Sequence, residues 1–293
     1  MSTEPLVTTE WVEAHLADPD VVVAEVDEDT TLYDTDHIPG AIALHWQADL
    51  HDPVRRALID AESFAALMDR NGITNDTHVV LYGGNYNWFA AFTFWCLRLY
   101  GHERVSLMDG GRKLWELESR PLTSTEATRR SAQGYEATGP DPGLRILRDE
   151  LLDRFVGAPD GTALVDARSP EEYRGEIITP QRLPLEAAQV PGHIPGAVNI
   201  PSVEVLEDES GRFRPRDELR ELYAAHGVRG EDEVVTYSRV GESSAHSWFV
   251  LHELLGFERV RNYDGSWTEY GSLVDVPVAR ADLDDDTGRN RAA

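Results

Sequence analysis

The segment His37-Ile-Pro-Gly-Ala-Ile42 occurs a second time as His193-Ile-Pro-Gly-Ala-Val198, 156 residues further along the chain. Two more pairs of segments match at an offset of 155: His78–Tyr82 with Glu233–Tyr237, and Gly101–Val105 with Gly256–Val260. Several matches at a nearly constant spacing indicate that one domain has been duplicated, because unrelated motifs would match at different spacings. The fold of the whole chain can therefore be predicted from the secondary structure of one copy.

Each copy contains predicted strands and helices in the same alternating order. The expected strands are Val21–Val26 and Val79–Tyr82, then Ala163–Asp166 and Val234–Tyr237, with one more short strand before Asp109-Gly110 and before Asp264-Gly265. The expected helices are Ala61–Asn71 and Trp88–Tyr100, then Arg216–His226 and Ser244–Leu255. This alternation predicts an α/β fold in which each domain is a parallel sheet with helices on both faces.

The domain boundaries follow from the repeat and from composition. Residues 123–143 are rich in Thr, Ser, Gly and Pro and have no hydrophobic periodicity, which is typical of a surface linker. We therefore expect an N-terminal domain over residues 1–122 and a C-terminal domain over residues 144–276. Residues 277–293 form an acidic tail that we expect to fray.

The charge of the chain is strongly negative. Asp and Glu number 53 against 27 Lys and Arg, a net charge of −26, and Lys113 is the only lysine. Such a surface repels nucleic acids and anionic membranes, since both are bound through cationic side chains, so we expect neither as a partner. An acidic surface can simply keep a protein soluble. The near-absence of lysine favours a second interpretation, adaptation to high salt, where repulsion between carboxylates is screened.

Other sequence features limit the location and the chemistry. The longest apolar runs are far shorter than the ~18 residues of a membrane span. The start, Met1-Ser-Thr-Glu-Pro5, lacks the basic and apolar regions of a signal peptide, so we expect a cytoplasmic protein. The single cysteine, Cys96, excludes an internal disulfide and lies on an apolar helical face, which predicts a buried core residue. His252-Glu253 lacks the second histidine of a zinc-protease helix, and we expect no metal site.

A candidate binding loop follows the strand that ends at Tyr237. Ligands of parallel sheets bind at the carboxyl ends of the strands, and this loop lies at such an end. It comprises Ser238, Arg239, Val240, Gly241, Glu242 and Ser243. A loop wrapped around a helix N-terminus directs backbone N–H groups inward and can bind an anion, and Arg239 could add positive charge at its rim. Length and small residues alone are equally typical of an ordinary strand-to-helix connection.

Several longer motifs lie outside this loop. In the first half they are His37-Ile-Pro-Gly-Ala41, Tyr82-Gly-Gly-Asn85, Asn87-Trp-Phe-Ala-Ala91 and Asp109-Gly-Gly-Arg-Lys-Leu-Trp115. In the second half they are Leu164-Val-Asp-Ala-Arg-Ser-Pro-Glu-Glu-Tyr173, Gly192-His-Ile-Pro-Gly-Ala-Val-Asn199 and Arg261-Asn-Tyr-Asp-Gly-Ser-Trp-Thr-Glu-Tyr-Gly271. Through these motifs essentially the whole chain resembles the tandem-rhodanese sulfurtransferases, which include thiosulfate and 3-mercaptopyruvate sulfurtransferases.

The resemblance implies a silent first domain and a second domain that carries the active loop. In the family, a cysteine at the first loop position takes the outer sulfur of thiosulfate as a persulfide and passes it to cyanide or a thiol. Ser238 stands at that position, and Arg168 matches the family's substrate-binding arginine. The last loop position, commonly Arg in close relatives, is Ser243. The expected partners are a small sulfur-containing anion such as thiosulfate and a thiol or protein acceptor of sulfur, with no cofactor.

The serine at position 238 changes the chemistry that this loop can perform. A thiol has a pKa of ~8.5 that such a loop can lower, so it provides a soft, ionised nucleophile. A serine hydroxyl is far less acidic, and oxygen forms no equivalent of a persulfide. The first copy offers no substitute, because Gly83 aligns with Ser238. We therefore expect Ser238 to impair sulfur transfer.

Two functional hypotheses remain. The chain is either a thiosulfate sulfurtransferase by lineage that is impaired by Ser238, or a pseudo-enzyme that binds sulfur oxyanions or a partner protein in a regulatory role. A serine hydrolase is disfavoured, because Ser238 would need a base and an orienting carboxylate. His246 lies in the following helix and His193 in the repeated turn, and we expect both to be structural.

Overall fold

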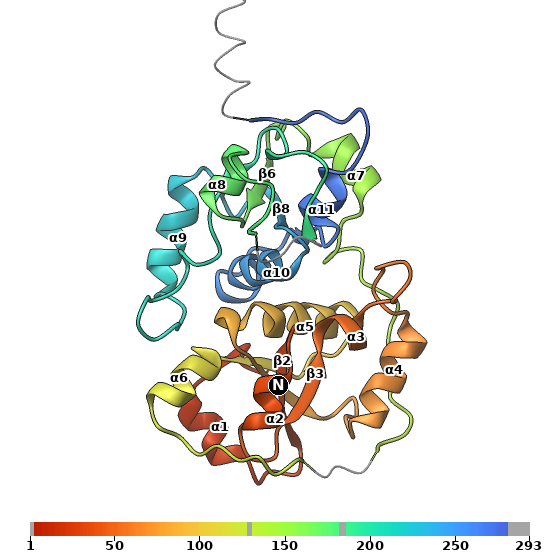
Figure 1. The fold of residues 1–293 in the computed structure, drawn as a ribbon, viewed down its shortest axis with the longest axis vertical. Coiled ribbons are helices and arrows are strands. Elements are labelled where there is room, and N and C mark those ends of the chain that lie inside the picture. The colour runs from red at the N-terminus through yellow and green to blue at the C-terminus, as the bar shows by residue number, and fades with distance from the viewer. Residues whose placement is uncertain (1–2, 128–130, 182–185, 281–293) are drawn as a thin grey trace, which may run out of the picture. The chain divides into compact units, whose positions relative to one another are not determined.

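The computed structural model describes residues 3–127, 131–181 and 186–280. The chain forms two compact units (Figure 1). Unit 1 comprises Met1–Asp141 and Leu206–Phe213, and unit 2 comprises Pro142–Val205 and Arg214–Ala293. Each unit contains a parallel sheet flanked by helices, so the predicted α/β fold with two similar domains is confirmed.

Unit 1 contains a five-stranded parallel sheet in the order β1-β5-β4-β2-β3. Its strands are β1 (Leu6–Val7), β2 (Val21–Asp27), β3 (Ile42–His45), β4 (His78–Tyr82) and β5 (Val105–Met108). All residues of β2 and β4 are buried. These two strands are therefore mostly apolar in sequence, as expected for strands covered on both faces, and the acidic exceptions in β2 are Glu25 and Asp27.

The helices of unit 1 cover both faces of this sheet. They are α1 (Thr9–His15), α2 (Thr31–Thr35), α3 (Trp46–Leu50), α4 (Ala61–Arg70), α5 (Trp88–Leu99) and α6 (Gly111–Leu117), with a short 3₁₀ helix η1 (Asn85–Asn87) before α5. Val12 of α1 and Trp115 of α6 pack with Tyr82 in one core cluster. In α5 every residue from Phe89 to Leu97 is buried, including Cys96 at 1% exposure, which confirms the core position expected for this cysteine.

Unit 2 repeats the arrangement with a four-stranded parallel sheet in the order β7-β6-β8-β9. Its strands are β6 (Thr162–Asp166), β7 (Val198–Asn199), β8 (Glu233–Tyr237) and β9 (Val260–Asn262). Asp166 pairs with Tyr237 across β6 and β8, as Glu25 pairs with Tyr82 across β2 and β4. The duplication thus extends to the register of the two central strands.

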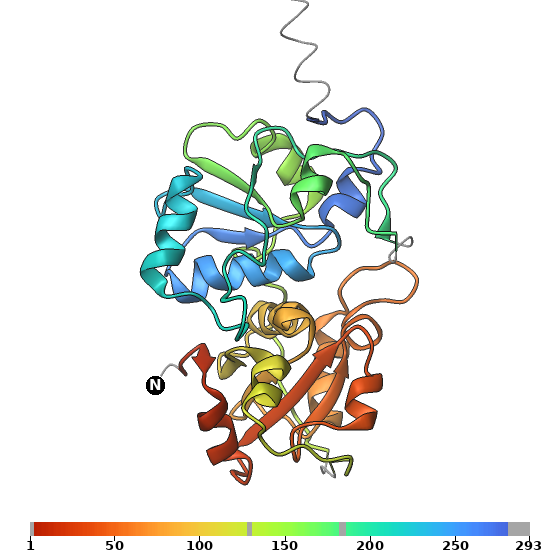
Figure 2. The ribbon, with the colours of Figure 1, turned by 60° about the vertical axis from the view of Figure 1, so that its left-hand side comes forward.

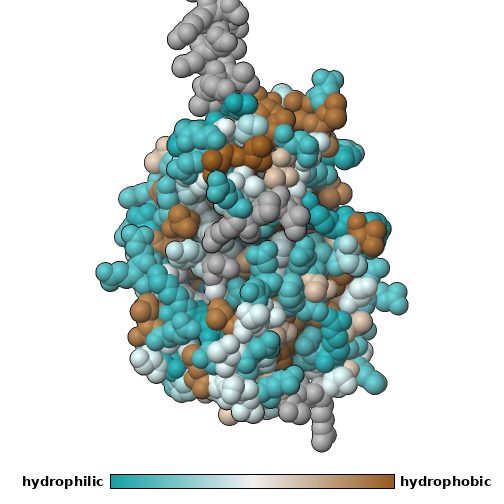
Figure 3. Space-filling view, in the orientation of Figure 1, coloured by the Kyte–Doolittle hydropathy of each residue, from teal (hydrophilic) through white to brown (hydrophobic). Residues whose placement is uncertain are grey.

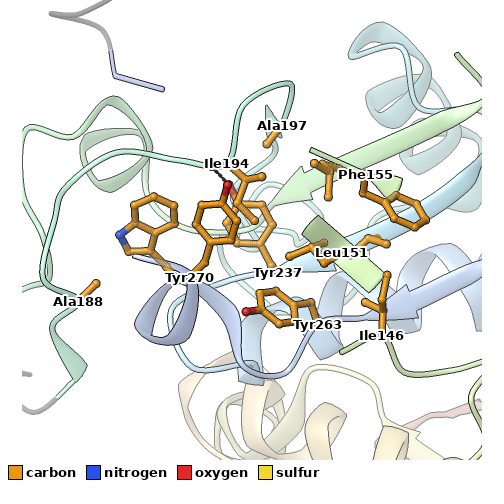
Figure 4. Close-up of a cluster of buried hydrophobic side chains, with 12 residues drawn as sticks. Ile146, Leu151, Phe155, Ala188, Ile194, Ala197, Tyr237, Tyr263 and Tyr270 are labelled. Atoms are coloured by element: carbon orange, nitrogen blue, oxygen red, sulfur yellow. Dashed lines mark hydrogen bonds between the residues drawn. The ribbon is translucent and has the colours of Figure 1, made fainter. Parts of the chain in front are cut away.

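The helices of unit 2 are α7 (Arg148–Arg154), α8 (Pro170–Arg174), α9 (Arg216–Ala225), α10 (Glu242–Phe249) and α11 (Ser266–Tyr270), and a π-helical turn η3 (Val250–Leu254) follows α10. Leu151 of α7 and Tyr237 of β8 belong to one core cluster (Figure 4). The same cluster contains Trp267 of α11. Helix α10 packs along β8 and β9 on the opposite face of the sheet (Figures 1 and 2). The end of β8 therefore lies between the two helical layers.

Helix α10 differs from the sequence prediction at both ends. It begins at Glu242, two residues before the expected start at Ser244. The reason is Gly241, whose φ of 105° lets the chain turn directly into the helix. Glu242 and Ser243 consequently form the first turn of α10, and the candidate loop is shorter than predicted. At the other end the helix continues as the π-helical turn rather than as a regular α-helix.

The segment expected to be a linker is hydrogen bonded to unit 1 where it is described. Ala132 N–H donates to the carbonyl of Asp69, and Thr138 N–H donates to the carbonyl of Tyr100. Tyr135 is 6% exposed, so this part is packed rather than free on the surface. Residues 281–293, most of the expected acidic tail, lie outside the described residues.

Hydrophilic side chains cover much of the face drawn in Figure 3, and apolar ones form small patches between them. Within the described parts of the chain, no helix has the length and apolar character needed to cross a membrane.

Candidate functional site

Ser238 follows β8 directly and is completely buried. Its N–H donates to Ser266 Oγ at 3.0 Å, and its Oγ accepts the N–H of Gly241 at 3.1 Å. The same Oγ lies 3.5 Å from Glu242 Oε2. These contacts fix the hydroxyl group inside the turn, between the end of the strand and the first residue of α10.

Helix α11 supports the loop from one side. Trp267 N–H donates to the carbonyl of Ser238, and Thr268 N–H donates to the carbonyl of Arg239. Together with Ser266 these residues belong to the motif 261–271, which therefore acts by holding the loop. The motif can be recognised in the sequence, but its role in holding the loop cannot, because a sequence motif does not reveal its hydrogen-bond partners.

Glu242 is a buried carboxyl group next to Ser238. Only 4% of it is exposed, and burial raises its pKa to about 7, with a further rise from the Glu186 carboxylate. Arg239 and the backbone N–H groups of Glu242 and Ser243 act in the opposite direction and lower this pKa. Glu242 is therefore partly protonated near neutral pH.

Arg239 is engaged by two carboxylates. Its Nε and Nη2 donate to the oxygens of Glu172 at 2.9 and 3.1 Å, and its Nη1 donates to Glu186 Oε2 at 2.9 Å. Glu172 is 1% exposed, and its carboxylate raises the pKa of Arg239 further above the usual range. The positive charge expected at the rim of the loop is thus neutralised within the protein.

The remaining loop residues, Val240, Gly241 and Ser243, lie in the same turn of unit 2. A Cβ at Gly241 would lie 2.9 Å from the carbonyl oxygen of Asp264, and the positive φ also requires glycine here. Ser243 is 6% exposed, whereas Val240 is half-buried. The structure therefore brings all six predicted loop residues together, with Glu242 and Ser243 as the first helical turn.

Arg168, two residues beyond β6, is buried with 3% exposure. Its Nη2 donates to Asp166 Oδ2 at 2.6 Å and to the carbonyl of Gly192 at 2.7 Å, and its Nε donates to Asp166 Oδ1 at 3.0 Å. The guanidinium group also lies over the ring of Trp267, 4.7 Å from the ring centre. Among the described residues, its Nη1 has no hydrogen-bond partner. These contacts are those of a buried ion pair.

Comparison with known proteins identifies the domain type. The model of the rhodanese-like domain matches residues 8–118 and again residues 148–273. The chain belongs to the rhodanese family. It is 52% identical over 276 residues to a protein of Mycolicibacterium smegmatis named "Putative thiosulfate sulfurtransferase", covering 94% of this chain and 98% of that protein. It is 50% identical over 280 residues to the "Sulfur carrier protein TtuD" of Thermus thermophilus, covering 95% of this chain and 98% of that protein.

Solved structures agree on the fold. An anaerobic ergothioneine biosynthesis enzyme from Chlorobium limicola, in complex with trimethyl histidine, superposes with a TM-score of 0.82 at 22% sequence identity. The match covers 94% of this chain and 70% of that chain. Wild-type EanB gives the same TM-score and identity over 94% of this chain and 69% of its own. At this identity the likeness concerns the rhodanese fold alone.

Each rhodanese domain has an arginine guanidinium group at an equivalent position, but the two arginines come from different places in the sequence. In the first domain Arg112 of α6 donates to Glu25 Oε1 at 3.0 Å and to the carbonyl of Asp36 at 2.7 Å. Arg168 makes the corresponding contacts in the second domain, with Asp166 and Gly192. The repeat offset of 156 aligns Asp36 with Gly192, but sequence alone does not align the two arginines.

The matching loop of the first rhodanese domain is filled by its own backbone and side chains. Gly83, aligned with Ser238, donates its N–H to Asn87 Oδ1, and Gly84 N–H donates to Asp27 Oδ2. A Cβ at Gly83 would lie 2.3 Å from the carbonyl oxygen of Val26. The backbone there leaves no space for a nucleophilic side chain.

His246 and His193, the two histidines considered as possible bases, have surroundings typical of structural residues. Burial lowers the pKa of His246 to about 3, so its ring is neutral. His193 Nδ1 is 2.7 Å from the carbonyl oxygen of Tyr173, and its ring stacks on that of Tyr173 at 3.7 Å. In the first rhodanese domain His37 makes the same pair of contacts with Tyr33, at 2.7 and 3.8 Å. The repeated histidine therefore closes a turn in both domains.

Proposed function

We propose that this protein descends from thiosulfate sulfurtransferases and has lost the sulfur-transfer step at Ser238. The observation that carries the proposal is the position of Ser238 Oγ, fully buried at the carboxyl end of β8 and hydrogen bonded to Gly241 N–H. In the resembled family this place belongs to the cysteine that forms the persulfide. The names of relatives at about half identity support the lineage.

The lineage reaction requires a thiolate. The thiolate attacks the outer sulfur of thiosulfate, the S–S bond breaks, and sulfite leaves with the bonding electrons. Cyanide or a thiolate then takes the outer sulfur from the persulfide, and the enzyme thiolate is regenerated. Glu242, with a pKa of about 7, is too weak a base to ionise a serine hydroxyl 3.5 Å away. The native chain therefore stops before the first bond forms.

A non-catalytic role is the second candidate. The loop keeps its hydrogen-bonded form around Gly241, and α11 holds it through two N–H donors, of Trp267 and Thr268, and one acceptor, Ser266 Oγ. Such a loop can bind a sulfur oxyanion or receive a sulfur-bearing group of a partner protein without turnover. The name of the Thermus thermophilus relative, a sulfur carrier protein, is consistent with a protein partner.

Within this proposal the binding residues are Arg168, Arg239, Val240, Gly241, Glu242 and Ser243. Val240 is half-buried and Ser243 is 6% exposed, and neither side chain takes part in an ion pair. Arg168 and Arg239 are both held by internal carboxylates, but Arg168 Nη1 has no hydrogen-bond partner among the described residues and can donate to a ligand without breaking the ion pair. The same ion pairs also position the loop and the strand end. We also propose a cytoplasmic location.

The test is thiocyanate formation from thiosulfate and cyanide in molar salt. Native protein, Ser238→Cys and the control Ser272→Cys are compared, since Ser272 is an exposed serine of the same unit. We expect thiocyanate above the blank only with Ser238→Cys, because that variant alone places a thiol at the end of β8. Turnover by the native chain would falsify the proposal. Activity in neither cysteine variant would favour the purely binding role.

A further inference from the structure

The carboxyl group of Glu242 lies beside Ser238 Oγ at the start of α10. Helix N-termini bind anions through backbone N–H groups that have no partner within the helix. At the start of α10 the N–H groups of Glu242 and Ser243 act on the Glu242 carboxyl group itself. The same carboxyl group reaches Ser238 Oγ at 3.5 Å. When ionised, Glu242 is thus an internal anion of its own helix.

The charges around Glu242 do not neutralise it. Arg239 is the cation that faces it, but this arginine also pairs with Glu172 of α8 and with Glu186. Among the residues that the structure describes here, one cation therefore faces three carboxyl groups. His246, one turn further along α10, is neutral because burial lowers its pKa to about 3. With Ser243 as its last residue, the predicted loop has no second cation to offset the carboxylate.

We propose that Glu242 is the specificity-determining residue of the Ser238 loop: its ionised carboxylate excludes sulfur oxyanions, and its protonated form admits them. The inference rests on the proposed function, since it takes the loop to be the binding site. A sulfate or thiosulfate oxygen that approaches the first turn of α10 meets a like charge in a site without bulk water, where repulsion is strong. With a proton on Glu242, the same carboxyl group becomes a hydrogen-bond donor toward the anion.

The sign of the pH effect follows from the state of Glu242. Its pKa of about 7 means that the carboxyl group is neutral at pH 6 and ionised at pH 8.5. Sulfate and thiosulfate stay fully ionised across this range, so any change in their affinity is caused by titration of the protein. Oxyanion binding is therefore expected to weaken as the pH rises through 7.

Isothermal titration calorimetry with sulfate and with thiosulfate tests the inference on the full chain at constant chloride. We expect the native Kd to rise at least tenfold between pH 6 and pH 8.5. Glu242→Gln should bind at pH 8.5 as native protein does at pH 6, with a change below threefold across the range. The control Glu218→Gln removes an exposed carboxylate of α9 and should follow native protein. Equal pH dependence in native protein and Glu242→Gln, or no binding by either, would overturn the inference.

A second arm separates this inference from the proposed function. In the Ser238→Cys background, Glu242→Gln should lower the KM for thiosulfate at pH 8.5 at least fivefold and change kcat by less than threefold. Thiocyanate production with the same KM in both variants would reject the role of Glu242 and leave the lineage proposal intact. Failure of Ser238→Cys to turn over, with the calorimetric difference present, would reject the lineage proposal alone.

Discussion

Arg168 and Asp27 occupy equivalent positions in the two rhodanese domains and carry opposite charges. Asp166 pairs with Tyr237 in the second domain, as Glu25 pairs with Tyr82 in the first. Arg168 lies two residues after Asp166, and Asp27 lies two residues after Glu25. In the second domain Arg168 donates to Asp166, the last residue of β6, and its guanidinium group lies over the ring of Trp267. In the first domain Arg112 supplies the cation instead, and Asp27 accepts the N–H of Gly84. The conserved element is the buried ion pair, whichever residue provides its arginine.

Replacement of Arg168 by methionine tests this structural role. Asp166 is completely buried, and without Arg168 its charge would have no cation at this position. Removal of one partner of a buried pair costs about 3–5 kcal/mol, so we expect a loss of that order. The measurement is denaturant unfolding in molar salt, followed by the fluorescence of the buried Trp248 and Trp267. Arg174→Met, at an exposed arginine of α8, should change stability by less than about 1 kcal/mol. A similar small effect at Arg168 would contradict the assignment.

Glu242→Gln should stabilise the protein in a pH-dependent manner. The folded-state pKa of Glu242 is raised from 4.5 to about 7, so the native state binds the proton more tightly than the unfolded chain. The stability associated with this proton is fully present below pH 4.5 and is lost as the pH rises through 7. One pKa unit corresponds to about 1.4 kcal/mol, so the loss is on the order of 3 kcal/mol.

The measurement for this second prediction is the difference in unfolding free energy between Glu242→Gln and native protein. It should be small at pH 5, grow between pH 5 and pH 7, and level off near pH 8.5. Glu218→Gln should show no such growth, because Glu218 is half exposed. A difference that is constant with pH would mean that Glu242 titrates normally in the folded protein.

The first domain should not be convertible into an active one by a single change. A Cβ at Gly83 would meet the carbonyl oxygen of Val26 at 2.3 Å, so Gly83→Cys and Gly83→Ala must displace a buried strand. We expect each to destabilise unit 1 by about 1–3 kcal/mol, and Gly83→Cys to produce no thiocyanate. Gly139→Ala is the matched control, because a Cβ at Gly139 has no atom within 4 Å. Thiocyanate formation by Gly83→Cys would show that this loop can accommodate a nucleophile.

The sheets could be predicted from sequence because their signals are local. The strands at Val79 and Val234 are apolar runs at a constant offset, and both lie within one residue of their predicted starts. The partners of Arg239 could not be predicted in this way. Glu172 and Glu186 are 67 and 53 residues away in sequence, and nothing in their local pattern points to an arginine.

Two further differences have the same kind of cause. The early start of α10 depends on the φ of Gly241, which a sequence does not display. The segment Leu206–Phe213 belongs to unit 1 although it lies within the sequence of the second copy, and Phe213 N–H donates to Asp109 Oδ1. Such a contact depends on tertiary packing, which the repeat pattern does not report.

Dependence on salt is the last prediction, and it follows from the net charge of −26. Carboxylates that repel one another across the surface are screened over ~3 Å at 1 M salt but over ~30 Å at 0.01 M, so dilution extends the repulsion over the whole protein. The unfolded chain spreads the same charge over a larger volume, and low salt therefore favours unfolding. We expect the melting temperature to fall by more than about 10 °C between 2 M and 0.05 M KCl. Sucrose at matched viscosity serves as the control, since it does not screen charge. An equal melting temperature at both salt concentrations would contradict adaptation to high salt and would mean that the acidic surface serves only to keep the protein soluble.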